Sequence, residues 1–156
     1  IPDKKTLIYF VPPIMQLTRA ADYAVRIMVH LAGLPPGSRP NRNVLAEASE
    51  VPEHFLSKIL QSLARARLID SQRGMNGGFS LARAPEQINL LDVVEAIEGP
   101  THLNACLLPG DSCGRKQWCP AHCIWAEAQD AMTSVLKRST IARLAARAGK
   151  DTPDQD

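Results

Sequence analysis

The chain has 156 residues, of which 45% are hydrophobic, 22% charged and 4% aromatic, and its formal net charge is +2. This length is typical of one domain and argues against two full-sized cores, and the composition excludes a disordered chain. No apolar stretch approaches the roughly 20 residues that cross a bilayer, so we place the protein in the cytoplasm and expect no membrane partner. Few aromatics and frequent Ala, Leu and Arg favour a mainly α-helical fold.

Charge is distributed unevenly along the chain. Residues 39–83 contain seven basic and four acidic side chains, whereas residues 84–130 contain two basic and seven acidic ones. A nucleic-acid-binding surface in one part of a domain would produce this asymmetry, and a solvated charged surface would produce the same count. The charge pattern alone leaves both interpretations open.

The N-terminal part is predicted to contain one helix. Residues 1–14 show no usable periodicity, and we interpret them as an extension or leader before Met15. From Thr18, a plausible N-cap, apolar side chains recur with the spacing of one helix face. This pattern predicts a helix over residues 19–32.

Two further helices are predicted inside the basic segment. Asn43 is expected to cap a short helix over residues 44–48, and Pro52 is expected at the first position of a second, very regular helix. A short helix, a tight turn and an amphipathic helix form the helix-turn-helix pattern. The apolar stripe of the second helix consists of Phe55, Leu56, Ile59, Leu60 and Leu63. The polar side chains expected to contact DNA bases are His54, Ser57, Lys58 and Gln61.

A β-hairpin is predicted directly after this unit. Residues 68–73 and 79–83 are short extended runs on either side of a glycine-rich turn, and its Asn76-Gly77 pair is a strong hairpin signal because both residues tolerate positive φ. A hairpin that follows a helix-turn-helix makes a winged helix. We therefore expect Arg73 and Asn76 to contact DNA from the wing, with a solvated strand end as the alternative for Arg73.

Three helices are predicted after the hairpin. The first covers residues 88–97, with Asn89 as a candidate cap and Gly99 as its end. A long helix over residues 120–137 and a short one over residues 141–148 follow. The long helix is expected to form a homodimer interface, so that two recognition helices reach successive major grooves of a pseudo-palindromic double-stranded DNA operator about 34 Å apart or a multiple of it. Its apolar face consists of Ile124, Trp125, Ala128, Met132, Val135 and Leu136.

All four cysteines lie within 18 residues, at Cys106, Cys113, Cys119 and Cys123. A disulfide framework would join distant segments, and the spacing lacks the paired Cys-x2-Cys knuckles typical of structural zinc sites. Soft thiolates in such a loop suit an iron-sulfur cluster, with zinc and thiol redox switching as alternatives. Cys123 also fits a buried packing role. Because a Cys-x2-Cys redox motif is missing as well, we expect neither an enzyme nor a small-molecule substrate.

These patterns predict a mainly α protein with a winged helix-turn-helix domain, a two-stranded wing and a long C-terminal dimerisation helix. The expected units are an N-terminal extension (1–14), the winged helix-turn-helix domain (15–100), a cysteine-rich cluster-binding loop (101–123), the dimerisation helix with a short final helix (120–148) and an acidic tail (149–156).

Several stretches together resemble a known family. They are Met15-Gln16-Leu17-Thr18, Asp22-Tyr23-Ala24-Val25-Arg26, Phe55-Leu56-Ser57-Lys58-Ile59-Leu60, Arg73-Gly74-Met75-Asn76-Gly77-Gly78, Leu91-Asp92-Val93-Val94 and three spaced cysteines. Over residues 15–146 the chain is similar to the bacterial winged-helix regulators that include IscR, NsrR and RirA, and its wing resembles NsrR and RirA more than IscR. The resemblance implies a homodimeric transcription factor whose iron-sulfur cluster senses iron, cluster supply, nitric oxide or redox state.

The resemblance also implies a ligand set. Carried over by position, the family's three cluster cysteines fall on Cys106, Cys113 and Cys119. The fourth ligand differs among members, because His122 matches the histidine of the IscR type and Asp22 matches the NsrR aspartate, which comes from the partner subunit. We rank Asp22 ahead of His122 and Cys123 third, and favour a [4Fe-4S] cluster over a [2Fe-2S] one. A surface residue in the first turn of a helix is the alternative for Asp22.

Overall fold

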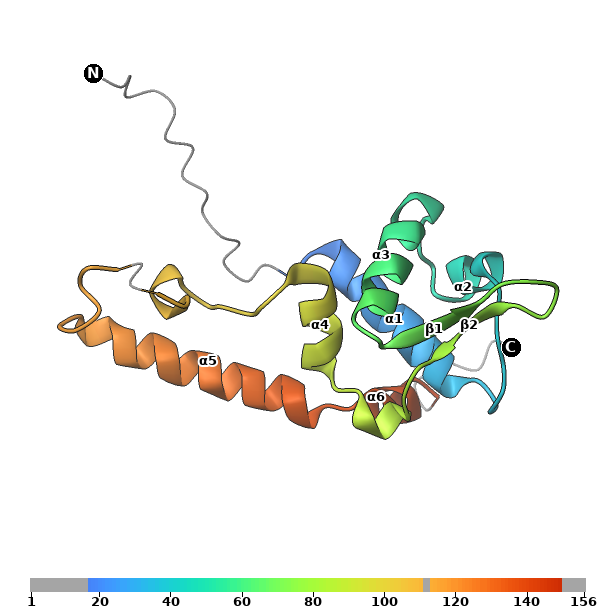
Figure 1. The fold of residues 1–156 in the computed structure, drawn as a ribbon. Coiled ribbons are helices and arrows are strands. Elements are labelled where there is room, and N and C mark those ends of the chain that lie inside the picture. The colour runs from blue at the N-terminus through green and yellow to red at the C-terminus, as the bar shows by residue number, and fades with distance from the viewer. Residues whose placement is uncertain (1–16, 111–112, 150–156) are drawn as a thin grey trace, which may run out of the picture.

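The computed structural model describes residues 17–110 and 113–149 (Figure 1). The elements in chain order are α1 (Arg19–Gly33), α2 (Arg42–Ala48), α3 (Glu53–Arg65), β1 (Ile69–Gln72), β2 (Gly78–Leu81), the 3-10 turn η1 (Pro85–Gln87), α4 (Leu90–Glu98), the 3-10 turn η2 (Ala105–Leu107), α5 (Pro120–Arg138) and α6 (Ile141–Ala148). The predicted mainly α fold with a two-stranded wing is thus confirmed. The predicted leader and nearly all of the predicted tail lie outside the described residues. Among the helices that are described, none is long and apolar enough to cross a membrane.

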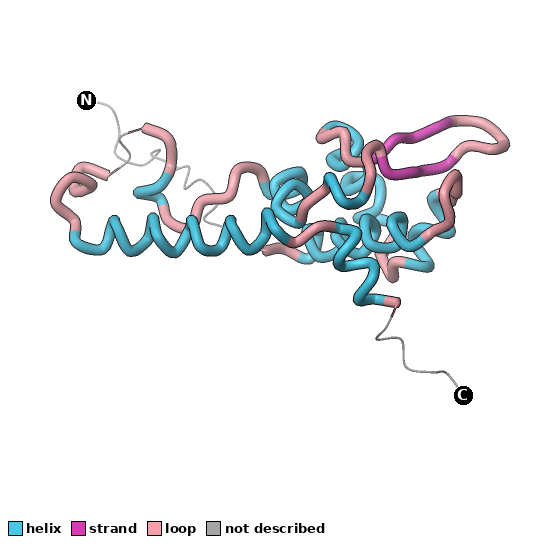
Figure 2. The backbone as a smooth tube through the Cα atoms, turned by 90° about the horizontal axis from the view of Figure 1, so that it is seen from below, coloured by secondary structure: helices cyan, strands magenta, loops and turns pink. Residues whose placement is uncertain are grey.

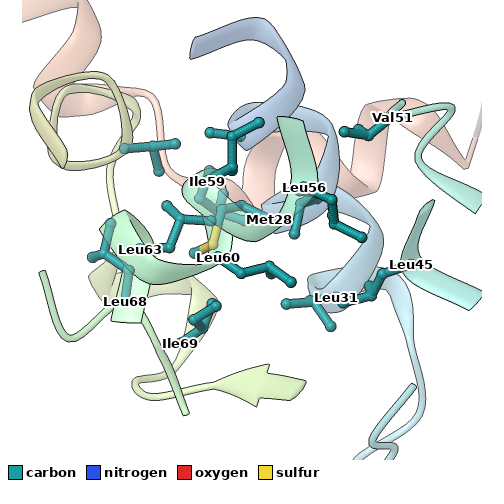
Figure 3. Close-up of a cluster of buried hydrophobic side chains, with 14 of the residues drawn as sticks. Met28, Leu31, Leu45, Val51, Leu56, Ile59, Leu60, Leu63, Leu68 and Ile69 are labelled. Atoms are coloured by element: carbon teal, nitrogen blue, oxygen red, sulfur yellow. The ribbon is translucent and has the colours of Figure 1, made fainter. Parts of the chain in front are cut away.

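A hydrophobic core joins α1, α2, α3 and β1 with α6 (Figure 3). Both α1 and α3 bury one face because their apolar residues recur every three or four positions. Each large aliphatic side chain that is fully buried contributes about 2 kcal/mol to folding. Phe55 departs from the predicted apolar stripe, since it is 36% exposed and packs at the surface against the ring of Tyr23, with 5.5 Å between the ring centroids. The core therefore fixes the orientation of α3 and leaves its other face to solvent.

Helix starts in the helix-turn-helix differ from the predicted ones. The N-cap of α2 is Asn41, not Asn43, because the side-chain oxygen of Asn41 accepts a hydrogen bond from the backbone N–H of Val44 at 3.0 Å. Pro52 is the N-cap of α3 and not its first residue. A cap side chain must precede the first helical residue, so α2 begins two residues earlier than predicted.

Thr18 is the N-cap residue of α1, as predicted, but its side chain has another role. It makes no cap hydrogen bond, and its hydroxyl donates instead to Oε1 of Glu98 at the end of α4. The backbone N–H of Thr18 donates to the same oxygen at 3.2 Å. Thr18 therefore ties the beginning of α1 to the end of α4.

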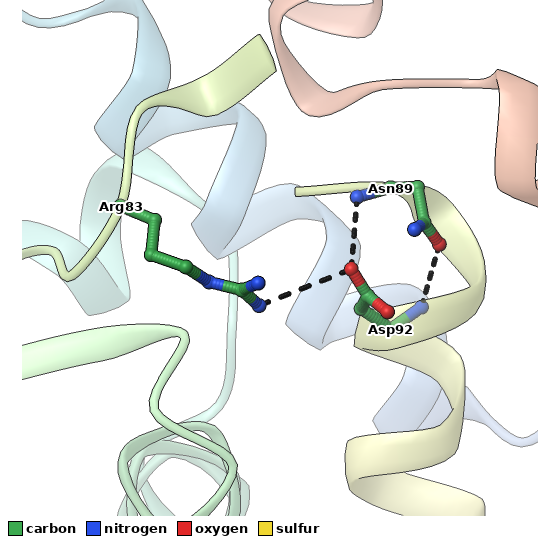
Figure 4. A network of polar contacts seen from close by, with 3 residues as sticks. All are labelled: Arg83, Asn89 and Asp92. Carbon is green, nitrogen blue, oxygen red and sulfur yellow. Dashed lines mark hydrogen bonds and ion pairs between the residues drawn. The ribbon is translucent and has the colours of Figure 1, made fainter. Parts of the chain in front are cut away.

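A reciprocal pair of hydrogen bonds begins α4 (Figure 4). The side chain of Asn89 accepts from the backbone N–H of Asp92 at 3.0 Å, and Oδ2 of Asp92 accepts from the backbone N–H of Asn89 at 3.2 Å. Arg83 lies 3.9 Å from the same carboxylate oxygen. The predicted cap is thus confirmed, but the helix starts at Leu90 because Ile88 is extended and buried, and its carbonyl accepts from the N–H of Ile141.

Asn89→Ala is expected to lower the free energy of unfolding by about 1–2 kcal/mol, because the backbone N–H of Asp92 at the helix start loses its side-chain acceptor. Urea denaturation measures the loss. Asn104→Ala is the matched control, since Asn104 is the N-cap of η2 without a side-chain cap hydrogen bond. Equal losses for both variants would contradict the role of the capping box.

The wing is an antiparallel hairpin in which Ile69 pairs with Leu81 and Gln72 with Gly78. The hairpin prediction is confirmed, but its turn is built differently, since Gly74 has positive φ (+106°) and Asn76 does not. The backbone N–H of Phe79 donates to the carbonyl of Pro40 at 3.0 Å, so the segment before α2 runs beside β2. A Cβ on Gly78 would lie 2.3 Å from the carbonyl oxygen of Arg39, and only glycine allows this approach.

Helix α5 projects from this body (Figures 1 and 2). It contacts α4 and η2, and none of its side chains is buried within the chain. The residues between α4 and α5 carry the cysteines out along the helix, and the N–H of Leu103 donates to Oε1 of Gln129 at 3.0 Å. The predicted bounds of α5 and α6 are confirmed to within one residue, and the hydroxyl of Thr140 caps α6 by accepting from the N–H of Arg143.

Candidate DNA-binding surface and cysteine loop

The polar face of α3 divides between two sides of the helix. Ser57 and Gln61, one helical turn apart, line a groove between α3 and the wing. Lys58 lines a separate cleft with Thr18 and Glu98, between α3 and the ends of α1 and α4. His54, Lys58 and Gln61 are exposed and Ser57 is half-buried, so the structure leaves all four predicted base-contacting side chains accessible.

The groove beside Ser57 and Gln61 also contains Arg42, which the prediction of base contacts did not include. Its Nη2 donates to the backbone carbonyl of Glu53 at 3.3 Å. This bond holds the charged guanidinium of Arg42 at the junction of α2 and α3. The only sequence signal for Arg42 was its place in the basic segment, which does not distinguish it from other surface arginines.

At the wing tip, Arg73 and Asn76 are both exposed. Arg39 and Asn41 lie close to this tip, and together with Asn76 they line a shallow hollow. Arg39 is brought there because the segment before α2 pairs with β2. The region of the wing tip therefore presents two arginines, Arg73 from the wing and Arg39 from the segment before α2, and the sequence analysis predicted only Arg73.

The cysteine loop holds its thiols unpaired. Cys106 lies in η2, Cys113 in the loop and Cys119 at the N-cap of α5, and all three are half-buried free thiols. A thiolate at Cys119 would face the positive end of the helix dipole. Within residues 17–110 and 113–149, no three His, Cys, Asp or Glu side chains converge closely enough to hold a metal ion.

Cys123 is exposed in the first turns of α5, so it is not a packing residue in the core of its own chain. Its Sγ–H donates to the backbone carbonyl of Pro120 at 3.2 Å. The apolar residues that follow it are exposed as well, because α5 has no cover from its own chain at this end.

Two histidines near the cysteines have an unpartnered ring nitrogen. Nδ1 of His122 is buried and has no hydrogen-bond partner among the described residues, and the same holds for Nδ1 of His102 at the start of the loop. Buried polar atoms are rarely left unsatisfied, and a neutral imidazole nitrogen is a good metal ligand. His102 did not stand out in the sequence because it lies outside the cysteine spacing.

Asp22 is exposed in the first turn of α1. The cysteines belong to η2, the loop and the start of α5, and the start of α5 lies away from α1 (Figure 1). Its carboxylate pairs with Arg26 at 3.0 Å. Arg26 also lies 3.6 Å from Glu50, which has positive φ (+52°) in the turn between α2 and α3. Asp22 and the three cysteines are thus not brought together within one chain.

Residues 17–147 match the family Rrf2, whose description is iron-dependent transcriptional regulator. The chain belongs to the Rrf2 family. It is 35% identical over 131 residues to a helix-turn-helix-type regulator of Mycobacterium tuberculosis, with 84% of this chain and 81% of the relative covered. It is 34% identical over 131 residues to the transcriptional regulator NsrR of Geobacillus kaustophilus, with 83% and 89% covered.

Solved structures of other Rrf2-type regulators share this fold. IscR of T. potens superposes with a TM-score of 0.71 at 24% identity, covering 91% of this chain and 94% of that chain. CymR, the global cysteine regulator of B. subtilis, superposes with a TM-score of 0.69 at 26% identity, covering 85% and 98%. These structures show the winged-helix fold, and membership of the Rrf2 family makes the protein a DNA-binding transcriptional regulator and not an enzyme.

Proposed function

We propose that this Rrf2 protein is a cytoplasmic homodimer whose affinity for a pseudo-palindromic operator is controlled by an iron-sulfur cluster, with [4Fe-4S] favoured. The observation that carries the proposal is the set of three unpaired thiols, Cys106, Cys113 and Cys119, on one loop at the start of α5. Thiolate is the preferred ligand of iron-sulfur clusters, so this donor set fits the group. When bound, the cluster would supply a centre that reacts with oxidants or nitric oxide.

The fourth ligand remains a choice among three side chains of this chain. We favour Asp22 of the partner subunit, because Asp22 is exposed and lies away from its own cysteines. His122 is the second candidate, supported by its unpartnered Nδ1. Cys123 is the third. If Asp22 is the ligand, its carboxylate would also pair with Arg26. Arg26 faces Glu50 in the helix-turn-helix as well, so this arginine would link the ligand to the DNA-binding unit.

For DNA recognition we propose that α3 enters the major groove and the wing the adjacent minor groove. Ser57 and Gln61 would read base edges, with His54 and Lys58 on the same exposed helix. Arg73 and Asn76 would contact the minor groove or its phosphates from the wing. Dimerisation through the exposed apolar side of α5 would place two such units on one operator.

A second candidate is regulation by the thiols themselves or by zinc, without an iron-sulfur cluster. Among the described residues, no three thiols lie close enough together to hold one metal ion. In addition, CymR, a cysteine regulator, has the same fold at 26% identity. Reversible oxidation of neighbouring cysteines would then change the loop. This mechanism predicts a colourless protein.

Anaerobic purification followed by absorption and Mössbauer spectra, with iron and sulfide counts, separates these functions. We expect a brown protein with visible absorption, and a different affinity for its selected operator after the iron is removed by a chelator. A colourless protein that contains zinc, or one whose DNA affinity responds only to thiol oxidants, would overturn the cluster and support the second candidate.

Gln61→Ala is expected to reduce discrimination between operator and random DNA by about tenfold or more, since one base contact is lost. Arg73→Ala should weaken binding to both DNAs and, if it neutralises one phosphate, lower the salt slope by about one unit. Binding titrations at several salt concentrations measure both effects. Gln87→Ala and Arg147→Ala, exposed residues in η1 and α6, are the controls. Equal losses on both DNAs for Gln61→Ala would show that α3 does not read sequence there.

A further inference from the structure

Met75, at the tip of the wing, is the most exposed large hydrophobic side chain in the part of the chain that the structure describes. Its relative exposure is 104%, and the next highest value is 68%, for Trp118. Single exposed apolar residues are common on protein surfaces. Met75 differs from them in its position, because it lies in the turn between β1 and β2, and this hairpin, whose strand β1 contacts α3, projects from the body (Figures 1 and 2).

The turn that carries Met75 is narrow. The N–H of Gly77 donates to the carbonyl of Gly74 at 2.9 Å, and a Cβ on Gly77 would lie 2.3 Å from the carbonyl oxygen of Gln72. Gly74 has a φ of +106°, which L-residues rarely adopt. Between these glycines, Met75 and Asn76 are the side chains that project from the tip.

Polar and basic residues lie near this apolar side chain. Arg73 precedes the turn, and Arg39 lines the same hollow as Met75 and Asn76. Arg39 is held there by the hydrogen bond from Phe79 to the carbonyl of Pro40. An apolar tip with two cations near it suits a partner with a negatively charged rim and a less polar interior. The minor groove of DNA fits this description, with phosphates on both edges and sugars along its walls.

We propose that Met75 is an apolar wedge that enters the operator minor groove beside each half-site and partly unstacks one base step. The minor groove is about 6 Å wide, and methionine, which is long and unbranched, is one of the side chains that minor-groove proteins insert in this way. Pyrimidine-purine steps unstack most easily, so the wing selects such a step through its deformability at a position outside the reach of α3. This inference rests on the proposed function as an operator-binding regulator, and adds a specificity determinant to it.

The test begins with parallel selection of binding sites from random duplex DNA by the wild-type protein and by Met75→Ala. We expect the wild type to enrich a pyrimidine-purine step at the position under the wing, and Met75→Ala to lose this enrichment while it keeps the sequence read by α3. On the selected operator, Met75→Ala should bind about tenfold more weakly than wild type with an unchanged salt slope, in contrast to Arg73→Ala.

A 2-aminopurine placed in the selected step reports unstacking directly. Its fluorescence should rise when wild-type protein binds and should rise much less with Met75→Ala. Met75→Gln, which keeps the length of the side chain but makes it polar, should behave like Met75→Ala, and Met75→Leu should retain most of the effect. Leu17→Ala, at another exposed apolar residue outside the wing, is the control and should match wild type.

Two outcomes would overturn the proposal, and they are distinguishable. If wild-type protein selects a clear operator, and Met75→Ala matches it in affinity, step preference and 2-aminopurine signal, then Met75 is not a wedge and the regulator function stands. If neither protein enriches any sequence, whatever the state of its cysteines, then operator binding itself is wrong.

Discussion

Cys113→Ala is expected to yield a colourless protein whose DNA affinity no longer responds to iron removal. Only two of the three proposed cysteine ligands then remain, and we expect that these two cannot hold the cluster stably, so Cys106→Ala and Cys119→Ala should give the same result. The cluster needs to stabilise one arrangement of the DNA-binding units over the other by only a few kcal/mol to change DNA affinity by about two orders of magnitude. In these variants, this change of affinity on iron removal should disappear. Absorption spectra, iron counts and operator titrations measure the loss.

Asp22→Ala, His122→Ala and Cys123→Ala serve as the comparison set for these cysteine variants. Each should retain some cluster, and the variant at the true fourth ligand should change the spectrum and shorten the lifetime of the cluster in air. A Cys113→Ala protein with a full cluster spectrum would contradict the ligand assignment. Equal DNA affinity of wild-type protein with and without its cluster would contradict the switch.

A mixed dimer tests whether Asp22 acts across the subunit interface. One chain carries Asp22→Ala and the other Cys113→Ala, with different affinity tags so that only the heterodimer is recovered. If Asp22 acts in trans, the three cysteines of the first chain meet the intact Asp22 of the second, and the heterodimer holds one wild-type-like cluster. If Asp22 acts within its own chain, the cluster should have the altered spectrum of the Asp22→Ala homodimer. If Asp22 is not a ligand, the Asp22→Ala homodimer itself already has the wild-type spectrum.

Val135→Glu is expected to convert the protein into a monomer and to weaken operator binding by at least two orders of magnitude. Val135 is 44% exposed on α5, so the substitution leaves the core of the chain intact. In a two-fold symmetric interface it introduces two carboxylates at once, and a monomer loses the second half-site and the gain in effective concentration that it provides.

Ser134→Glu is the matched control for Val135→Glu. It adds the same charge in the same helical turn, but Ser134 lies on the side of α5 that carries Glu127 and Asp130. Sedimentation equilibrium at micromolar concentration should show a dimer for the control and a monomer for Val135→Glu. A wild-type protein that sediments as a monomer even with operator present would contradict the dimer.

Sequence periodicity predicted most of this fold because amphipathic helices bury one face. The bounds of α1, α5 and α6 agree with the prediction to within one residue, and Asn89 caps α4 as predicted. The predicted start of α2 was wrong. Asn41 and Asn43 are equally suitable N-caps by residue type, and only the packing of the turn decides which of them precedes the helix. The hairpin of the wing was predicted correctly, but its turn residue was not, since Gly74 and not Asn76 adopts the positive φ.

The candidate sites were only partly predictable. The positions of Ser57, Gln61 and Arg73 follow from local patterns, whereas the approach of Arg39 to the wing depends on a hydrogen bond between segments about 40 residues apart in the chain. Cysteine spacing identifies a loop with soft ligands, but not which side chain of which subunit completes the site. His102 illustrates this limit, because its unpartnered nitrogen becomes visible only once the loop is packed.

The length of α5 determines both the distance and the direction of the cysteines relative to the DNA-binding body. Its 19 residues span about 28 Å, and among the described elements it packs mainly against α4 and η2. A tilt of about 10° at the body would move the far end by about 5 Å, so the helix acts as a lever arm. Inserting a single residue would rotate the loop by about 100° relative to the body, whereas inserting seven would nearly restore its direction and only lengthen the arm. The number of residues in α5 therefore constrains the direction in which any signal at the cysteines can act on the DNA-binding units.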